Sequence, residues 1–394
     1  MTDAITIQNP RNRGGSTGHV LAKRSVTFTE IRSGSPSKRE ILRKVGFFMR
    51  ADEMIWFLQG QSSQRDVIAG AMEAIQGRVP VMASHRQVRP EVTEGADIVL
   101  KEPDSDSDRV QWAIDVAKHR GVKVMHVGRA GREFEDRRGE FESLGIDLVT
   151  GGLSIKTFDQ VDDKSVFTAE AEAAGLAVIP AVTVSNAAEL KAAIDSMRGK
   201  HQVCVKPARG IYGMGFWRLD AEADPFRCFA NAGDHTVNES VFVQAYGDSA
   251  NQKPLLVMPY MAGSECSVDM VLHKGKVIAY CGRRKEGMYQ TFSFEGPAVE
   301  LAIQAAEHFG CDGIINVQTR DDSEGTPHLL EINPRYSGGI GYTRLAGINL
   351  PGIFAASRLG FDHPPVEMLT GVMLKGIPTP VRVDNLFPKS TLTA

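Results

Sequence analysis

The first half of the chain alternates short apolar runs with stretches whose apolar residues recur at helical spacing. Four of these runs have the length of buried strands, at residues 54–58, 79–83, 98–100 and 122–127. Helical patterns at residues 65–75 and 106–119 lie between them. Strands that alternate with helices predict a parallel α/β sheet. Because Gln59-Gly60-Gln61 rather than GxGxxG follows the first strand, we predict no dinucleotide-binding domain.

The second half reads as paired strands. A strand at residues 202–207 ends in Lys206 and Pro207, a glycine-rich turn follows, and a further strand starts at Phe216. This order predicts a hairpin flap. More antiparallel strands are expected at residues 255–260, 266–271, 276–280, 313–318 and 328–333, with a helix at 297–309.

Composition narrows the class of protein. A chain of 394 residues suggests two or three domains, and 42% hydrophobic with 24% charged residues is typical of a globular protein. The net charge of −3 argues against nucleic acid as a partner. The five cysteines form no CxxC pair, so we expect reduced thiols in a cytoplasmic protein. No apolar run approaches the ~18 residues that span a bilayer, so we expect no membrane partner.

The two ends of the chain differ from the rest. Residues 1–50 are rich in Gly, Ser and Arg, and we expect a flexible N-terminal extension that buries little surface. Two alternatives stay open: the natural start lies at Met49 or Met54, or the extension is a basic arm that touches RNA. Residues 381–394 are expected to form a C-terminal tail.

A metal site is predicted near the end of the strand pattern. Glu331 and Asn333 are two residues apart on a strand, so their side chains leave the same face, and Gln318 on the preceding strand could join them. Carboxylate and amide oxygens suit Mg²⁺, which shares its site with substrate phosphates. The alternative is a polar strand edge that faces solvent.

An anion site is predicted beside it. Lys206 precedes glycines that would let backbone N–H groups approach a phosphate, although an ordinary glycine hairpin is the alternative. Arg335 and the Ser337-Gly338-Gly339 turn could hold a carboxylate or an acyl-phosphate. The alternative for Arg335 is a surface ion pair.

Five motifs follow one another along the chain: Asp163-Lys164-Ser165, Val205-Lys206-Pro207 with the glycine turn, residues 258–265, Asn316-Val317-Gln318, and Glu331-Ile332-Asn333-Pro334-Arg335. In this order they resemble the ATP-grasp superfamily. The likeness is closest to the branch of carbamoyl-phosphate synthetases and carboxylate–amine ligases, and it covers about residues 54–380. It implies a pre-ATP-grasp domain at 54–155, a small lobe with the flap at 156–258, and a large lobe with the metal site at 259–380.

The resemblance also implies how ATP would bind. Lys164 and Lys206 match the two cations that hold the phosphates, and Glu265 matches the acid that binds the ribose. The flap matches Gly210, Gly213 and Gly215. The hinge that reads adenine through its backbone matches Met258, Pro259, Tyr260 and Met261. Relatives usually begin this hinge with Glu, where this chain has Met258-Pro259, but contacts made by the main chain should survive the change.

The remaining matches concern metal and chemistry. Gln318, Glu331 and Asn333 match the ligands of one or two Mg²⁺ ions, with Mn²⁺ as an alternative. Arg335 matches the acyl-phosphate side, and either Arg283 or Arg284 takes the place of a basic residue near the γ-phosphate. Because Gln318 stands where many relatives have an acid, Glu331 is the one anionic ligand expected, which would weaken the metal site.

The implied activity is that of an ATP-dependent carboxylate–amine ligase. A small-molecule carboxylate would attack the γ-phosphate, and an amine would then displace phosphate to form an amide. Two alternatives are an ATP-binding regulatory protein without turnover, and an enzyme of the kinase or carboxylase type that acts on a small acid. Many relatives are dimers, which suggests a homodimer.

Overall fold

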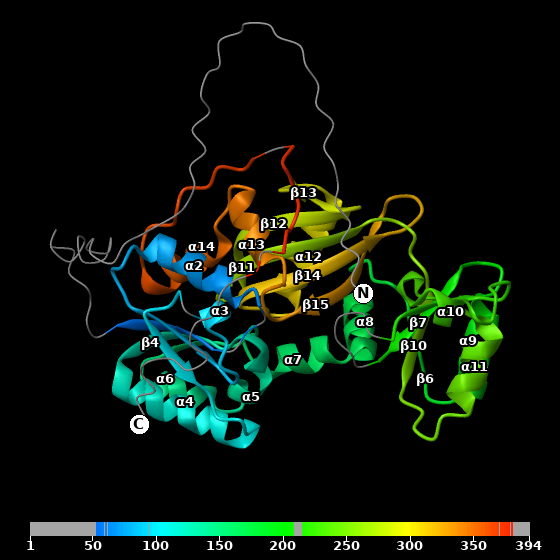
Figure 1. Ribbon diagram of the computed structural model, residues 1–394, viewed down its shortest axis with the longest axis horizontal. Coiled ribbons are helices and arrows are strands. Elements are labelled where there is room, and N and C mark those ends of the chain that lie inside the picture. The colour runs from blue at the N-terminus through cyan, green and yellow to red at the C-terminus, as the bar shows by residue number, and fades with distance from the viewer. Residues whose placement is uncertain are drawn as a thin grey trace, which may run out of the picture. The chain divides into compact units, whose positions relative to one another are not determined.

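The computed structural model describes residues 53–380 apart from 59, 61, 94, 209–214, 370 and 379. All of these belong to one compact unit. The predicted extension at 1–50, the tail at 381–394, and Gly210 and Gly213 of the flap lie outside the described residues. The described chain forms three sheets (Figure 1). Each sheet lies in one of the three predicted domains, except that the second sheet extends one residue beyond position 258, and the boundaries stay a prediction.

The first sheet is parallel, with the strand order β3-β2-β1-β4-β5. Its strands are β1 (Met54–Phe57), β2 (Val81–His85), β3 (Ile98–Lys101), β4 (Val122–His126) and β5 (Asp147–Val149). Ile55 and Phe57 enter one apolar cluster with α2 (Gln64–Ile75), while Met54 and Trp56 enter another with α4 (Asp106–Arg120). Since both faces are buried, the strands read as unbroken apolar runs. The predicted α/β class is confirmed.

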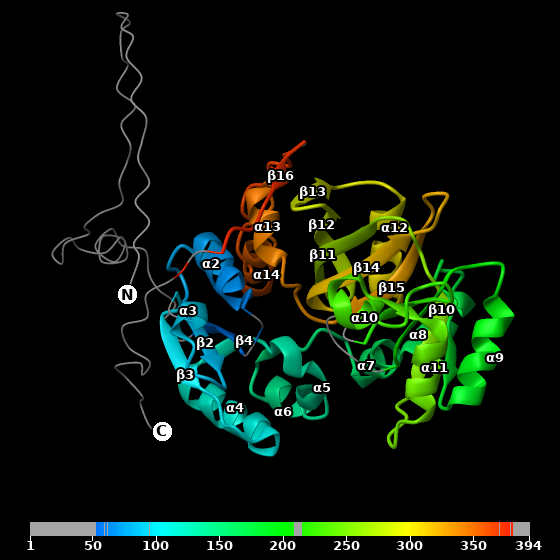
Figure 2. The ribbon, with the colours of Figure 1, turned by 45° about the vertical axis from the view of Figure 1, so that its right-hand side comes forward.

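The second sheet belongs to the region predicted as the small lobe. Its order is β6-β10-β7-β8-β9, from β6 (Val182–Val184), β7 (Val203–Pro207), β8 (Trp217–Asp220), β9 (Thr236–Asn238) and β10 (Leu255–Pro259). Helices α9 (Ala187–Met197) and α11 (Glu239–Gly247) lie side by side at this sheet in two views (Figures 1 and 2). β7 and β8 are antiparallel, as the predicted hairpin flap requires.

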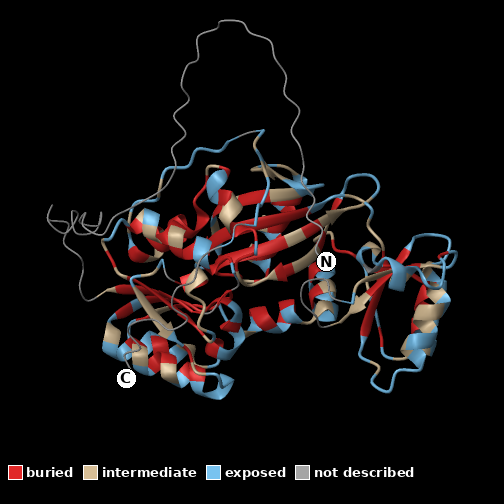
Figure 3. Cartoon of the chain, in the orientation of Figure 1, coloured by how far each residue is buried: buried red, intermediate tan, exposed pale blue. Residues whose placement is uncertain are grey.

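The third sheet has six strands in the order β15-β14-β11-β12-β13-β16. They are β11 (Glu265–His273), β12 (Lys276–Glu286), β13 (Tyr289–Ser293), β14 (Gly313–Asp321), β15 (Pro327–Asn333) and β16 (Met373–Leu374). Helix α12 (Pro297–His308) packs on one face and α14 (Leu350–Leu359) on the other. Buried residues accordingly dominate the central strands β11 and β14 in Figure 3, whereas helices of the small lobe show many exposed residues.

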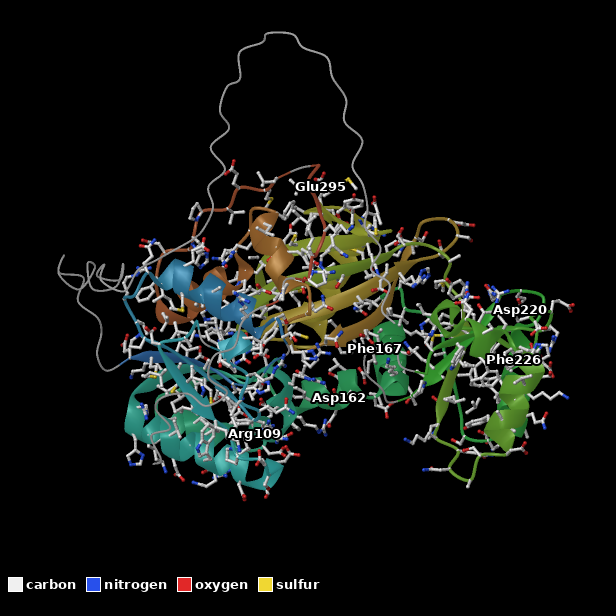
Figure 4. All side chains as sticks on the ribbon, viewed as in Figure 1. Arg109, Asp162, Phe167, Asp220, Phe226 and Glu295 are labelled. Carbon is white, nitrogen blue, oxygen red and sulfur yellow. The ribbon has the colours of Figure 1, made fainter. Side chains whose placement is uncertain are left out.

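Two helices connect the first sheet to the small lobe. They are α7 (Ile155–Asp162) and α8 (Lys164–Ala173), and Asp163 between them caps α8 by accepting from the backbone N–H groups of Ser165 and Val166. Phe167 of α8, labelled in Figure 4, packs on Phe309 with ring centroids 5.1 Å apart. Lys164 is therefore fixed at the start of a capped and packed helix.

The remaining helices are short: α3 (Pro90–Thr93), α5 (Gly131–Glu135), α6 (Arg138–Ser143), α10 (Arg227–Ala230), α13 (Ile340–Leu345), and the 3₁₀ turns η1 (Gly128–Ala130) and η2 (Ala232–Asp234). None of the described helices has the length and apolar character that crossing a membrane requires. All five cysteines are described and are free thiols, as expected.

Candidate active site

A cavity of about 570 Å³ lies between the second and third sheets. One side of it is apolar, with Ile179, Cys204, Met258, Phe216 and Leu330 packed into a cluster that draws on both sheets. The other side is polar and carries most of the residues predicted from the sequence. A cavity of this size with an apolar wall and a few placed polar groups fits a small-molecule ligand.

The cavity gathers eleven of the sixteen predicted site residues. These are Lys164, Lys206, Met258, Pro259, Tyr260, Met261, Glu265, Gln318, Glu331, Asn333 and Arg335. Gly215, Arg283 and Arg284 are outside the lining, and Gly210 and Gly213 lie outside the described residues. The roles assigned to all of them stay predictions.

Strands β14 and β15 place the predicted metal ligands side by side. Gln318 pairs across the two strands with Glu331, so both side chains leave the same face of the sheet. The register slips by one residue beyond this pair, because Thr319 pairs with Leu329. The extra residue, Leu330, joins the cavity lining next to Glu331. A β-bulge thus puts an apolar and an acidic side chain on the same wall.

A row of hydrogen bonds runs along that wall. Lys164 Nζ donates to Glu331 Oε2 at 3.3 Å. Asn333 Nδ2 donates to Glu331 Oε1 at 2.9 Å, and Arg335 Nη2 donates to Asn333 Oδ1 at 3.0 Å. The Asn333 amide therefore bridges the acid and the arginine, and it fixes which way each of them points.

The charge of Glu331 interacts with two lysines, Lys164 and Lys206. Burial and the neighbouring Lys164 ammonium lower the pKa of Lys206 to about 8, although Glu331 opposes the change. Burial alone would raise the pKa of Glu331, but Lys164, Asn333 and Lys206 outweigh it and hold that pKa below its usual value. With both lysines charged, the group carries an excess positive charge, which favours an anion such as a phosphate.

Magnesium fits this wall only together with another ligand. Within the described residues, no group of three or more His, Cys, Asp or Glu side chains could hold a metal ion. Glu331 offers carboxylate oxygens, and Gln318 and Asn333 offer amide oxygens. This set is poor for a metal held by protein alone, but it suits Mg²⁺ that takes its other ligands from phosphates and water.

The base of the predicted flap requires glycine. Gly215 has φ +76°, and a Cβ there would lie 2.8 Å from Pro207 Cγ. Pro207 and Gly215 stand on the two sides of the turn that joins β7 to β8. A side chain at 215 would therefore push the two bases of the turn apart.

The two candidate arginines of β12 point to different places. The Arg283 side chain is 13% exposed, and its Nη2 donates to Ser267 Oγ at 3.2 Å and to Ser337 Oγ at 3.4 Å. Arg284 instead pairs with Asp321 at 2.7 Å. Because Ser337 lines the cavity, Arg283 is the one that reaches toward it.

Asp269 lies next to Arg283 and is fully buried. Its Oδ2 is 3.6 Å from Arg283 Nη2, and its Oδ1 accepts a hydrogen bond of 3.0 Å from Asn316. Burial raises the pKa of Asp269, although Arg283, Ser337 and Asn316 oppose the rise. One carboxylate thus supports three side chains that come from different elements.

Sequence reasoning missed several residues of the cavity wall, notably Ile179, His235, Asn316, Arg320 and Leu330. For two of these residues, the sequence contains a pattern that could have placed them in the site. Asn316 and Arg320 flank Gln318 at a spacing of two on β14, so an alternating pattern placed all three on one face. Leu330 had none, because the bulge that turns it inward depends on the pairing register.

Sequence comparisons agree with this geometry. Residues 251–377 match the family model described as ATP-grasp in the biosynthetic pathway with Ter operon. The arginine-specific large chain of carbamoyl phosphate synthase from Geobacillus stearothermophilus is 24% identical over 243 residues, which cover 58% of this chain. The predicted resemblance to the ATP-grasp superfamily is confirmed. The chain spans only 21% of the length of that synthase chain.

Solved structures share the fold of this chain. An ADP complex of N5-carboxyaminoimidazole ribonucleotide synthetase has a TM-score of 0.58 at 16% identity, covering 82% of this chain and 80% of the other. The biotin carboxylase domain of 2-oxoglutarate carboxylase from Hydrogenobacter thermophilus, solved with MgADP and bicarbonate, has a TM-score of 0.58 at 16% identity, covering 78% and 69%. An L-amino acid ligase from Bacillus licheniformis has a TM-score of 0.55 at 13% identity, covering 79% and 75%.

Proposed function

We propose that this protein is an ATP-dependent carboxylate–amine ligase that works through an acyl-phosphate. The row of Lys164, Glu331, Asn333 and Arg335 carries the proposal. It puts a lysine, a carboxylate and an arginine side by side in a cavity that is also lined by an apolar cluster. This combination suits a nucleotide whose base packs on the apolar side and whose phosphates meet the lysines.

Each residue has a part in the proposed reaction. A carboxylate oxygen of the acid attacks the γ-phosphorus, ADP leaves, and an amine nitrogen then attacks the acyl carbon so that phosphate leaves. Lys164 and Lys206 offset the charge of the phosphates, and Arg335 with the turn at Ser337 holds the carboxylate. Gln318, Glu331 and Asn333 would hold magnesium, which when bound supplies further neutralisation of the phosphate charge.

Relatives support ligase chemistry in part. The similar proteins include a carbamoyl phosphate synthase chain, an N5-carboxyaminoimidazole ribonucleotide synthetase and an L-amino acid ligase. We extend to this chain only the reaction class that they suggest, with a small-molecule acid and an amine as substrates. A homodimer and a cytoplasmic location remain predictions from the sequence.

The test is an acid-by-amine screen in which ADP release is measured with ATP and Mg²⁺. The ligase proposal expects ADP only when a matching acid and amine are both present, with an amide as product. ADP release that needs the acid alone would favour the kinase or carboxylase alternative. ATP binding without ADP release across the panel would favour a regulatory protein.

A further inference from the structure

Arg320 on β14 is tied to three of the residues predicted to bind the adenosine half of ATP. Its Nε–H donates to the backbone carbonyl of Met261 at 2.7 Å. Its Nη1 lies 3.8 Å from Glu265 Oε2, and Glu265 is also its partner across the strands. Its guanidinium carbon is 5.5 Å from the centre of the Tyr260 ring. One planar side chain thus contacts the hinge carbonyl, the hinge ring and the predicted ribose acid.

A second arginine contacts the same ring of the hinge. Arg218 on β8 lies 5.3 Å from the centre of the same Tyr260 ring. Its own guanidinium is held by Asp234 at 2.7 Å and by Thr236 at 2.8 Å. Tyr260 therefore contacts one guanidinium from each sheet, and cation–π attraction stabilises its position. Movement of the hinge would disturb both contacts.

The simplest alternative is that Arg320 and Glu265 form an ordinary surface ion pair without a role in binding. Such pairs contribute little when both side chains move freely in water. Arg320 differs because its side chain is 27% exposed, lines the cavity and donates a short hydrogen bond to the backbone. A guanidinium held at Nε has little freedom left, so its Nη1 is a fixed point next to the Glu265 carboxylate.

We infer that Arg320 is a positioning residue that holds the Glu265 carboxylate and the Met261 backbone in place, and so sets a preference for ribonucleotides over 2′-deoxyribonucleotides. This inference rests on the proposed nucleotide site. Glu265 acts on the sugar hydroxyls, and Arg320 acts through Glu265. Arg320 lies on the same strand and face as Gln318, so the sugar end and the metal end of the cavity share one rigid element.

The experiment compares the affinities of ADP and 2′-deoxy-ADP by titration calorimetry with Mg²⁺. The wild-type protein should prefer ADP by about tenfold, a typical effect of one hydrogen bond to a carboxylate. Arg320→Met should bring this ratio close to one. Arg320→Lys keeps the charge, but a single ammonium group cannot contact both the Met261 carbonyl and the Glu265 carboxylate. The preference of this variant for ADP over 2′-deoxy-ADP should therefore fall as well. Arg198→Met removes a surface arginine paired with Asp195 and Glu239, and should leave the ratio unchanged.

A mutant cycle separates positioning from a general loss of structure. Glu265→Gln should also bring the ratio close to one, and the double variant should be no worse than either single variant, because both act on one contact. Variants are compared after circular dichroism shows native folding. If Arg320→Met does not fold, Arg320→Lys and Glu265→Gln complete the cycle.

The outcomes separate this inference from the proposed function. An unchanged ratio in folded Arg320→Met or Arg320→Lys overturns the role of Arg320 while leaving the nucleotide site in place. A wild-type ratio of one does the same. A wild-type protein that binds neither ADP nor ATP overturns the nucleotide site and this inference with it.

Discussion

Lys164 Nζ lies 3.3 Å from Glu331 Oε2, although 167 positions separate the two residues along the chain. The contact joins the first turn of α8 to β15, the strand that carries two of the predicted metal ligands. Glu331 therefore contacts Lys164, which is predicted to bind phosphate, and is itself one of the predicted magnesium ligands. Changes at Glu331 should affect both functions, and in opposite directions.

Glu331→Gln should raise the magnesium concentration needed for half-maximal ADP formation by about tenfold or more, since it removes the one anionic ligand. The same change frees Lys164 and leaves the wall more positive, so ADP should bind at least as well without magnesium. Magnesium titrations of activity, and calorimetry with EDTA, measure the two effects.

Glu307→Gln is the matched control, because Glu307 pairs with Lys276 on the surface at 2.8 Å, away from the cavity. It should leave the magnesium dependence unchanged. If Glu331→Gln showed the same magnesium curve as this control, Glu331 would have no place among the metal ligands.

Much of the fold was readable from hydrophobic patterning. The strands at β1, β4, β7, β10 and β14 were predicted within a few residues because they are buried on both faces or end in unusual polar groups. The three-residue β5 and the two-residue β16 were missed, since such short strands carry no periodicity. The three-residue β6 (Val182–Val184) was not predicted either, and nearby Val178 forms only an isolated bridge with Leu329.

Part of the site could also be predicted from the sequence, because burial constrains which residues a strand can carry. Glu331 and Asn333 stand out because polar residues are costly in a buried strand unless they have a role. The choice between Arg283 and Arg284 could not be made from sequence, because neighbouring residues on a strand face opposite sides and the buried Asp269 that selects one of them lies on another strand. Contacts across strands depend on register, which the sequence pattern alone does not determine.

ATP affinity should fall as the pH rises through about 8, the pKa of Lys206 in the folded protein. Below that pH the amine is charged and meets the phosphates directly. Above it the free protein must take up a proton to bind, so affinity should drop by up to about tenfold per pH unit until the pKa of the bound form is reached. Calorimetry in buffers of different ionisation enthalpy should detect this proton uptake.

Two substitutions of Lys206 complete the test. Lys206→Arg keeps a charge at every pH used, so its affinity should not follow pH around 8. Lys206→Ala should abolish ATP hydrolysis in a protein that still folds. Normal turnover by Lys206→Ala, or a wild-type affinity that is flat between pH 7 and 9.5, would remove Lys206 from the phosphate site.

Arg283→Met should lower the rate of ADP formation by about 10²-fold, whereas Arg284→Met should change it little. Arg283 contacts Ser337 at the cavity, and Arg284 is held by Asp321. Asp269→Asn weakens the support of Arg283, so it should reproduce part of the Arg283→Met defect in kcat with a smaller change in ADP affinity. Steady-state kinetics of the three variants decide the point, and equal defects in Arg283→Met and Arg284→Met would refute the assignment.

Arg358 of α14 provides a test of stability away from the cavity. Its side chain is 2% exposed and binds Asp312 at 2.7 Å and Asp147 at 3.2 Å, which joins the N-terminal sheet to the start of β14. Arg358→Met would leave the buried Asp312 carboxylate without this cation, so the free energy of unfolding should fall by about 3 kcal/mol. Arg198→Met, at an exposed ion pair, should change it by less than about 1 kcal/mol. Urea unfolding of both variants measures the difference. A loss in Arg358→Met no larger than in Arg198→Met would mean that the three charged groups stay hydrated in the folded protein.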